Sequence, residues 1–360
     1  MLENICNKKA IMWLFYIMIN ILNFKKYLKI RRGVQKMRVQ DLIKCINQKT
    51  AKKTMSLLFL YIFMLSFCFV LLYPMIYILI NSFKSGYQFL DPSVQWVPKE
   101  IVFDNYDYIM KALNFEKTFL NTLIYSIGPS LVQLCSCAIA AYGLARFDFR
   151  GKSIFKAAMI LTILVPIMMI IVPTYVNFSF MDFFGILKGI SSLIGKDVRP
   201  NLIDTPFVFY LPSMLCVGLK GGLFIYIFNQ FFKGLPKELE EASSIDGAGP
   251  WRTFLQIVLP SSGSAIITVL IFSVVWHWND YYQPQMFLSD TSKYTLSVAM
   301  NNINPASIVA TLEKGQDFVS LNLSGMIFAG SVLLMAPLII FYLIIQRKFM
   351  ASIATSGIVG

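Results

Sequence analysis

Six long apolar runs divide the chain, and each is long enough to cross a membrane. A helix needs about 20 predominantly apolar residues to cross a hydrocarbon core about 30 Å thick. Within lipid every backbone polar group must find its partner inside the protein, so we interpret all six runs as helices. The predicted spans are residues 56–83, 118–145, 157–181, 205–232, 264–282 and 318–346.

A polar segment, residues 233–263, separates the fourth run from the fifth. Pro236 suits the first turn of a helix, and the acidic residues after it suit the positive helix end. We expect this helix to stop at Gly247, which adopts a left-handed backbone at little cost. Pro250 should begin a second short helix, and Pro260 should close it. The apolar faces expected for the two helices are Leu235, Leu239 and Ala242 in the first, and Phe254, Ile257 and Val258 in the second.

Composition and charge support a membrane protein and give its orientation. Hydrophobic residues make up 56% of the chain and charged residues 14%, whereas an average soluble domain has about 25% charged residues. Much of the net charge of +13 lies before the first run, which we interpret as a cytoplasmic flank and not as a nucleic-acid-binding surface. With six spans, the basic turn at 146–152 and the basic pair at 347–348 fall on the same side. We therefore predict that both termini and the polar hairpin are cytoplasmic.

This topology divides the chain into three parts. They are a basic N-terminal arm (1–55), a transmembrane domain (56–350) and a C-terminal tail (351–360). The arm contains a weaker apolar stretch, residues 10–24, which at 1.5 Å per residue is only about 22 Å long and short for a span. Its composition fits a signal-like apolar segment, an interfacial helix or a short extra span, but a span here would put residues 25–53 on the opposite side from the start of the chain or invert the topology. We interpret the arm either as residues that precede a translation start at Met37 or as an interfacial or loosely structured segment.

Sequence patterns for catalysis and metal binding are missing. Residues 151–153 read G-K-S, but Arg146 stands where a phosphate-binding loop needs glycine. The C-x-C pair Cys135 and Cys137 has no histidine nearby, and the chain has no H-E-x-x-H pattern. We predict no catalytic residue, no metal site and no ATP site. An ion-coupled secondary carrier would also need paired ionisable residues in the spans, which are almost absent.

The order of residues in the hairpin resembles the EAA motif of ATP-binding-cassette (ABC) importer permeases. Residues 241–260 read EASSIDGAGPWRTFLQIVLP, with the acidic start, the glycine and the I-x-L-P end of that motif. Ser243 stands where alanine is usual, and Ser264 where proline is common. Serine is small enough to keep the elbow open. The matching residues are Glu241, Ala242, Asp246, Gly247, Ala248, Phe254, Ile257, Leu259 and Pro260.

The resemblance covers most of the chain from about residue 56 and is closest to carbohydrate-uptake permeases of the maltose-transporter type. Further matches are FDNYDYI at 103–109, AYGLAR at 141–146, WND at 278–280 and YTL at 294–296. The tail departs from the family, because residues 357–360 read GIVG and lack its lysine.

The resemblance implies the type I ABC importer architecture, with six transmembrane helices, a cytoplasmic coupling-helix hairpin and alternating access driven by ATP. The implied partners are a dimer of ATPase subunits that carries ATP and Mg²⁺, a second permease subunit and an extracellular binding protein. No cofactor is expected on this chain. By resemblance, the residues that couple to the ATPase are Glu240, Glu241, Ala242, Ser243, Asp246, Gly247, Ala248, Phe254, Leu259 and Pro260.

Candidates for the solute pathway lie in the fourth and fifth runs. Trp278, Asn279 and Asp280 end the fifth run, with an interfacial aromatic belt and helix cap as the alternative. Lys220 is an intramembrane charge, which marks a functional site by default, unless its neighbouring glycines mark the outer start of the span. The resemblance implies a sugar or oligosaccharide as cargo. An alternative cargo is another polar solute, such as a glycerophosphodiester or an amino acid. The alternative class of protein is an ion-coupled secondary carrier, which the sequence favours much less.

Overall fold

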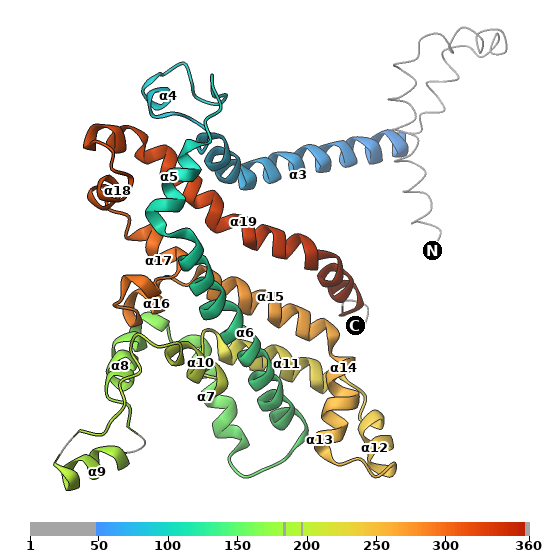
Figure 1. The fold of residues 1–360 in the computed structure, drawn as a ribbon. Coiled ribbons are helices and arrows are strands. Elements are labelled where there is room, and N and C mark those ends of the chain that lie inside the picture. Colours follow the sequence, from blue (N-terminus) through green and yellow to red (C-terminus); the bar gives the residue numbers. More distant parts are fainter. Residues whose placement is uncertain (1–47, 183–184, 196, 357–360) are drawn as a thin grey trace, which may run out of the picture. The chain divides into compact units, whose positions relative to one another are not determined.

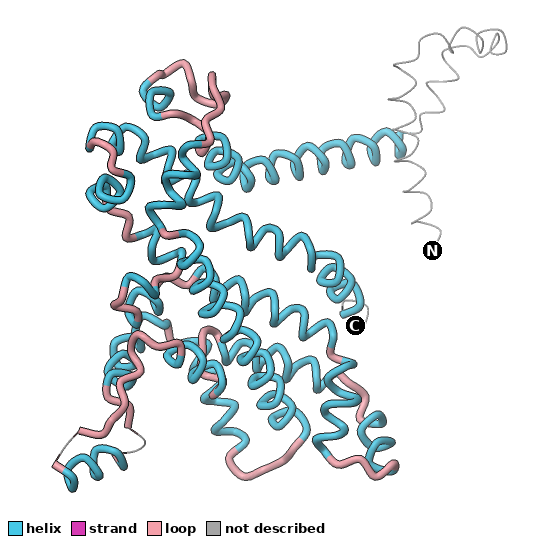
Figure 2. The backbone as a smooth tube through the Cα atoms, viewed as in Figure 1, coloured by secondary structure: helices cyan, strands magenta, loops and turns pink. Residues whose placement is uncertain are grey.

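The computed structural model describes residues 48–182, 185–195 and 197–356, and every regular element in these ranges is a helix (Figure 1, Figure 2). The chain divides into two units, Met1–Pro74 and Met75–Gly360, which are described separately. Most of the predicted arm, including residues 10–24 and Met37, lies outside the described residues, as does the end of the tail at 357–360.

The first unit contains the beginning of helix α3 (Gln48–Asn81). The stretch Thr54–Asn81 of this helix is long and apolar enough to cross a membrane, with a mean hydropathy of 2.6. The helix begins before residue 56, so the predicted boundary between arm and spans falls inside a helix. Pro74 also lies inside it and does not end it.

Three further predicted spans appear as helices at the expected places. Helix α6 (Phe115–Arg146) and the stretch Gln316–Phe349 of α19 (Gln316–Ser356) are each long and apolar enough to cross a membrane. Helix α15 (Gly263–Asn279) corresponds to the fifth predicted span. Helix α19 continues into the predicted tail as far as Ser356.

Helix α6 is the centre of the second unit. It packs against α10 (Phe207–Met214), α11 (Gly221–Gly234) and α15, while α19 packs against α15 and α5 (Asp104–Leu113). Phe224, Phe228 and Phe232 recur every four residues on α11 and are fully buried against α6 and α15. This packing fixes the ends of the helices from which the polar hairpin emerges.

Hydroxyl side chains follow one buried face of α6. The hydroxyl groups of Thr122, Ser126 and Ser130 each donate to the carbonyl oxygen four residues earlier. Buried hydroxyl groups are thereby satisfied within the helix itself, as an apolar environment requires. The polar positions of this span are therefore compatible with its burial.

The third predicted span is not one helix. It consists of α7 (Lys152–Leu164) and α8 (Ile167–Ser179), whose axes differ by 108°. Pro166 disfavours the helical backbone at the residue before it, and Val165 is extended, with a ψ of 119°. Pro173 lies inside α8 without ending it. The prediction of a single helix over 157–181 is therefore wrong.

The fourth predicted span is divided as well. Between α10 and α11 lies a turn in which Cys216 and Lys220 have left-handed φ angles of 64° and 59°. The turn is tightly packed, because a Cβ on Gly221 would lie 2.2 Å from the carbonyl oxygen of Cys216. Helix α10 has 8 residues and α11 has 14, so neither crosses a bilayer alone. The prediction of one helix over 205–232 is therefore wrong.

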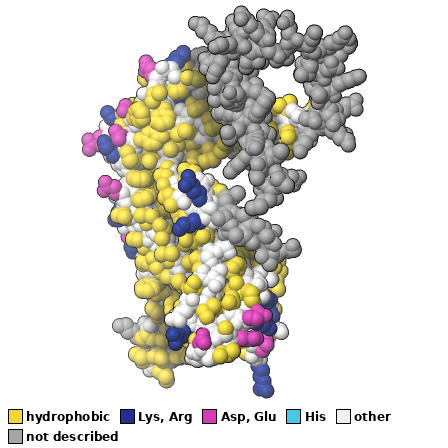
Figure 3. Space-filling model, turned by 90° about the vertical axis from the view of Figure 1, so that its right-hand side faces the viewer, with side chains coloured by type: hydrophobic (Ala, Val, Ile, Leu, Met, Phe, Trp, Pro, Cys, Tyr) yellow, Lys and Arg dark blue, Asp and Glu magenta, His cyan; other side chains and the backbone are white. Residues whose placement is uncertain are grey.

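Short helices occupy the longer connections. Helices α4 (Gly86–Leu90) and α5 precede α6, and α9 (Ile186–Ile194) lies between α8 and α10. Between α15 and α19 lie α16 (Tyr282–Phe287), a 3-10 turn (Thr291–Lys293), α17 (Leu296–Asn301) and α18 (Pro305–Leu312). Figure 1 shows α16, α17 and α18 at the opposite end of α15 from the polar hairpin. Hydrophobic side chains cover much of the surface visible in Figure 3, as expected of helices in lipid.

Candidate functional site

The polar segment between α11 and α15 folds as a hairpin with a left-handed elbow. Helix α12 (Glu238–Ile245) ends just before Gly247, whose φ is 79°. The amide of Ala248 donates to the carbonyl oxygen of Ser243 at 3.0 Å and closes the turn. Helix α13 (Pro250–Thr253) then begins at Pro250. The predicted stop at Gly247 and restart at Pro250 are both confirmed.

The second arm of the hairpin ends differently from the prediction. The backbone passes from α13 into a π-helical turn (Phe254–Val258) and then into α14 (Leu259–Ser261). The amide of Leu259 bonds to the carbonyl oxygen of Phe254, five residues earlier. This wider turn accommodates Pro260, whose ring would clash with the preceding turn of a regular helix. The 79° bend comes only after Ser261, so the prediction that Pro260 closes the helix is wrong.

An ion pair ties the first arm of the hairpin to the end of α6. The Nε atom of Arg146 lies 2.6 Å from Oε1 of Glu240, and its Nη2 atom donates to the carbonyl oxygen of Leu235 at 2.9 Å. The two side chains are only 8% and 20% exposed, so water screens this pair less than a surface pair. Glu240, one of the residues predicted to couple to an ATPase, is therefore turned towards its own chain.

A pair of hydroxyl groups joins the two arms of the hairpin. Ser243 of α12 and Thr253 of α13 are both buried, and their side-chain oxygens lie 2.7 Å apart. Ser243 is the position at which the motif usually has alanine. The serine makes a hydrogen bond across the elbow that an alanine cannot make.

Phe254 anchors the second arm in the main core. Its buried ring lies 4.9 Å from that of Tyr142 on α6 and 6.4 Å from that of Phe232 on α11, measured between centroids. Burial of a phenylalanine side chain stabilises a fold by about 1.5–3 kcal/mol. Val258 is buried in the same core, in agreement with the predicted stripe, and Leu259 packs at its edge while Pro260 is exposed.

The inward face of the first arm differs from the predicted apolar face. Leu235 packs partly against the core, but Leu239 and Ala242 are exposed. The side chains that point inwards are Glu240 and Ser243, because Arg146 and Thr253 supply partners for them. The apolar positions of α12 are therefore left on the outside of the hairpin.

The tip of the hairpin is uncovered. Glu241 and Asp246 are exposed, and neither forms an ion pair with any of the residues that the structure describes. Ile245 and Trp251 beside them are 86% and 63% exposed. Exposed apolar side chains with a rim of polar residues are typical of a surface that binds another protein.

The residues predicted for the solute pathway at the end of α15 have different surroundings. Trp278 is buried, its indole N–H donates to the carbonyl oxygen of Leu334 at 3.1 Å, and its ring lies edge-on to Phe119. Asn279 is exposed. Asp280 accepts two backbone amides at the start of α16. Asp280 therefore caps a helix, as the alternative predicts, whereas Trp278 is packed between helices and is not part of an interfacial belt. The pathway roles stay predictions.

Lys220 lies in the turn before α11 and faces an aromatic row. Its Nζ atom is 5.9 Å from the ring centroid of Trp276, which stacks on Phe272 at 5.4 Å and lies 5.6 Å from Phe224. A cation above an aromatic face is favourable. The 14 residues of α11 separate Lys220 from the hairpin, a rise of about 21 Å. Lys220 and Trp276 therefore lie at the end of α11 that is far from the hairpin.

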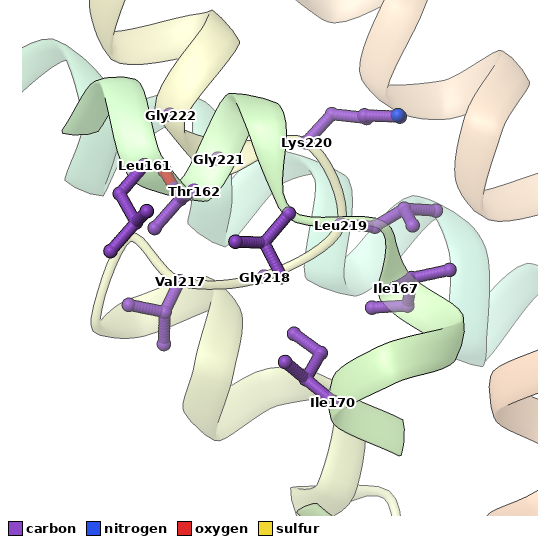
Figure 4. Close-up of a pocket in the computed structure, with 11 residues that line it drawn as sticks. Leu161, Thr162, Ile167, Ile170, Val217, Gly218, Leu219, Lys220, Gly221 and Gly222 are labelled. Atoms are coloured by element: carbon purple, nitrogen blue, oxygen red, sulfur yellow. The ribbon is translucent and has the colours of Figure 1, made fainter. Parts of the chain in front are cut away.

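A cavity of about 340 Å³ lies beside the same turn (Figure 4). It is lined by the end of α7, the start of α8 and the turn itself. Figure 4 shows that the side chain of Lys220 points away from the cavity, while those of Leu161, Val217 and Ile170 border it. The cavity is therefore apolar, and the cation belongs to the face that carries Trp276.

Sequence reasoning missed three residues that hold the hairpin or the turn with Lys220 in place: Gln133, Arg146 and Thr253. Gln133 of α6 is fully buried, its Nε2 atom donates to the carbonyl oxygen of Leu219 at 3.1 Å, and its Oε1 atom accepts from Ser273 of α15 at 3.4 Å. Its only signal in the sequence is an amide within an apolar run. Arg146 and Thr253 carried no signal of their partners, because those partners are distant in sequence or across the elbow.

Comparison with known proteins assigns this arrangement to a family. Residues 137–354 match the family described as binding-protein-dependent transport system inner membrane component. The matched region contains the hairpin, α11, α15 and the turn with Lys220. The chain belongs to this family and is therefore a membrane component of a transport system.

The chain is similar to several bacterial permeases. It is 29% identical over 285 residues to the diacetylchitobiose uptake system permease protein of Streptomyces coelicolor, covering 79% of this chain and 83% of that one. It is 26% identical over 264 residues to the trehalose transport system permease protein of Mycobacterium tuberculosis, covering 73% and 84%. Its fold is similar to a chain of a bacterial ABC transporter involved in the import of the acidic polysaccharide alginate, with a TM-score of 0.65, 22% identity and coverage of 84% and 98%.

Proposed function

We propose that this chain is the transmembrane permease subunit of an ATP-binding-cassette importer that translocates a sugar or an oligosaccharide. The observation that carries the proposal is the hairpin, whose base is braced against α6 while its tip exposes Glu241, Ile245 and Asp246. The cargoes named for its relatives, diacetylchitobiose and trehalose, support a carbohydrate.

In the proposed topology six segments cross the membrane. They are α3, α6, the α7–α8 pair, the α10–α11 pair, α15 and α19. Length and composition alone support three to five of them, and we add the α10–α11 pair because broken helices are common where transporters bind their solutes. An even number of spans leaves the arm (1–55), the tail (351–360) and the hairpin on one side, which the basic flanks favour as the cytoplasm.

The hairpin acts as the coupling element to an ATPase dimer, which binds ATP and Mg²⁺ itself. Glu241, Ile245 and Asp246 dock on the ATPase, and Gly247 keeps the elbow narrow. The base of the hairpin is fixed to α6 by Arg146 and Phe254, so a displacement of the tip moves the helix with it. Such rigid-body movement alternates the access of the pathway between the two sides of the membrane.

The solute passes between this chain and a second permease subunit, after delivery by an extracellular binding protein. On this chain we assign the pathway to the face that carries Lys220, Trp276 and Asn279. Lys220 and Asn279 are exposed and Trp276 is half-buried. An aromatic face suits the apolar face of a sugar ring, and the ammonium and amide groups suit its hydroxyl groups.

The proposal is tested with the whole complex, purified through this chain and reconstituted in liposomes with its binding protein. A panel of labelled monosaccharides and oligosaccharides is offered outside. We expect at least one of them to accumulate, and only when ATP and Mg²⁺ are present on the ATPase side. Accumulation of a sugar driven by an ion gradient in ATP-free liposomes would contradict the proposal. Accumulation of an amino acid or a glycerophosphodiester alone would keep the importer and replace its cargo.

A further inference from the structure

The connection between α8 and α10 contains a helix with a bare apolar face. Helix α9 has the sequence ILKGISSLI, and none of its residues is buried. Its apolar residues recur at the spacing that places them on one stripe of a helix. Four of them are exposed, namely Ile186, Ile190, Leu193 and Ile194. Leu193 is the most exposed of the four, at 89%.

One residue on the polar side of α9, Ser191, contacts the segment that follows the helix. The hydroxyl group of Ser191 accepts the amide of Val198 at 3.1 Å. Next to it Arg199 pairs with Asp197 at 2.7 Å and keeps the pKa of that carboxyl group well below its usual value. The guanidinium group of Arg199 also lies over the ring of Phe180. A helix in water turns its apolar side towards protein, whereas the apolar stripe of α9 is exposed and only Leu187 at its edge is half-buried.

A short stem fixes the ends of this connection to α8. The amide of Met181 donates to the carbonyl oxygen of Pro200 at 3.2 Å, and the amide of Leu202 donates to that of Phe178 at 2.8 Å. Gly185 and Gly195, at the two ends of α9, have left-handed φ angles of 85° and 72°. The helix is therefore held through its stem and its caps and not through a packed face.

The lipid bilayer is the partner that these observations favour. The family is an inner-membrane one, and α8 itself exposes apolar side chains along the turns that lead to the stem, among them Val172 and Val176. The exposed apolar stripe of α9 thus follows, along the chain, a predicted span that also exposes apolar side chains. The one charged side chain of α9 is Lys188, which suits the phosphate groups of lipids.

We propose that α9 is an interfacial helix that lies flat at the boundary between headgroups and acyl chains. Its nine residues have a length of about 13 Å, which suits a helix parallel to the membrane surface. The stripe of Ile186, Ile190, Leu193 and Ile194 faces the acyl chains, and Lys188 stays among the headgroups. The proposed topology puts the connection between the third and fourth spans outside the cell, so α9 lies in the outer leaflet; only this choice of leaflet rests on the proposed function.

Site-specific photocrosslinking identifies what covers α9. The photoreactive residue p-benzoylphenylalanine replaces Leu193 in the full-length chain, within the assembled importer in bacterial membranes. The matched control carries it at Ser192, which is exposed on the polar side of the same turn. After illumination, mass spectrometry identifies the adducts on the α9 peptide. We expect phospholipid adducts, several-fold more abundant at position 193 than at position 192.

Other outcomes overturn the proposal. Adducts at position 193 with the binding protein, or with the second permease subunit, would make α9 a protein-docking helix. Equal lipid yields at positions 192 and 193, or no adduct at either, would show that the apolar stripe is not immersed. The same replacement at Ile190 repeats the measurement one turn away, so that the result does not depend on a single position. A Lys188→Cys thiol that reacts only from the cytoplasmic side would refute the outer leaflet.

Discussion

The hairpin and the α9 connection are two excursions from the helix layer, and both expose large apolar side chains. They differ in how they are held. The hairpin is tied by the Arg146–Glu240 ion pair, by the ring of Phe254 and by the Ser243–Thr253 hydroxyl pair. Within the part of the chain that the structure describes, no ion pair or ring contact ties the apolar side of α9, and the helix is held by its stem.

This difference separates two meanings of exposed apolar surface. At the tip of the hairpin the apolar residues stand beside the carboxylates of Glu241 and Asp246, on a base that an ion pair and a buried ring tie to α6. On α9 they stand opposite a single cation, Lys188, on a helix that is held by its caps and its stem. The first arrangement suits a moving protein partner, and the second suits a lipid surface.

The largest effect is expected for Phe254→Ala. It removes a buried ring between α6 and the hairpin and should cost about 3–5 kcal/mol of stability. Thermal unfolding in detergent and ATP-dependent uptake should both fall. Leu255→Ala is the control, because Leu255 is exposed one position further on. Equal losses in the two variants would show that Phe254 does not anchor the hairpin.

Arg146→Ala should have the second largest effect. It removes the hydrogen bond from Nη2 to the carbonyl oxygen of Leu235 and leaves the largely buried carboxylate of Glu240 without its ion-pair partner. Loss of a hydrogen bond to a charged group should cost about 1.5–3 kcal/mol. ATP hydrolysis by the assembled complex should persist while uptake falls, because the base of the hairpin is no longer fixed. Lys152→Ala removes the exposed pair with Asp148 and should change neither. Unchanged coupling in Arg146→Ala would mean that the ion pair does not transmit movement.

Gly247→Val should weaken the elbow by about 1–2 kcal/mol, because a side chain disfavours the left-handed backbone. No atom lies within 4 Å of the position of its Cβ, so the cost is conformational and not a clash. Membrane insertion should be unchanged and the ratio of sugar transported to ATP hydrolysed should fall. Gly249→Val is a matched control, since Gly249 has an equally open surrounding and an ordinary φ of −72°. Normal transport by Gly247→Val would refute the role of the elbow.

The hydroxyl pair across the elbow should contribute less. Ser243→Ala and Thr253→Val should each lower the unfolding free energy by about 1 kcal/mol. Each variant removes one hydroxyl group and leaves the other hydroxyl group buried without its partner. The double variant should cost less than the sum of the two, since no unpaired hydroxyl group remains. Chemical denaturation of the four proteins measures this coupling. Strict additivity would show that the two side chains act independently.

Leu193→Ser should have the smallest effect on the protein itself. The side chain is exposed and makes no contact with the core, so the unfolding free energy in detergent should change by no more than about 0.5 kcal/mol. A loss as large as that of Ser243→Ala would show that α9 packs on protein. The contrast between the braced hairpin and the unbraced helix would then disappear.

The sequence located the helices better than their breaks. Long apolar runs can be recognised in the sequence because a helix that crosses lipid needs them. Helices α6, α15 and α19 follow three of these runs closely. The effect of a proline depends on the backbone conformation that the surrounding residues adopt, and the sequence does not reveal that conformation. Pro166 ends α7, Pro173 lies within α8, and Pro260 is accommodated by a π-helical turn.

The candidate site was predictable as a segment and less so as individual contacts. The left-handed elbow follows from the type of residue at Gly247, so the turn was predicted correctly. Glu240 and Glu241 are adjacent and chemically identical, and only the position of Arg146 decides which one turns inwards. The sequence does not distinguish Trp276 from Trp278 either. The packing of α15 against α19 buries Trp278 and leaves Trp276 on the face with Lys220.

The most direct test of the central claim is a crosslink from the tip of the hairpin. A photoreactive residue at Ile245, in the full-length chain in its own membrane, captures whatever docks on the tip. We predict a protein adduct whose peptides carry the nucleotide-binding motifs of an ABC ATPase, with a yield that changes when ATP is added. An adduct with lipid, or with a protein that binds no nucleotide, would contradict the assignment of the hairpin as the coupling element.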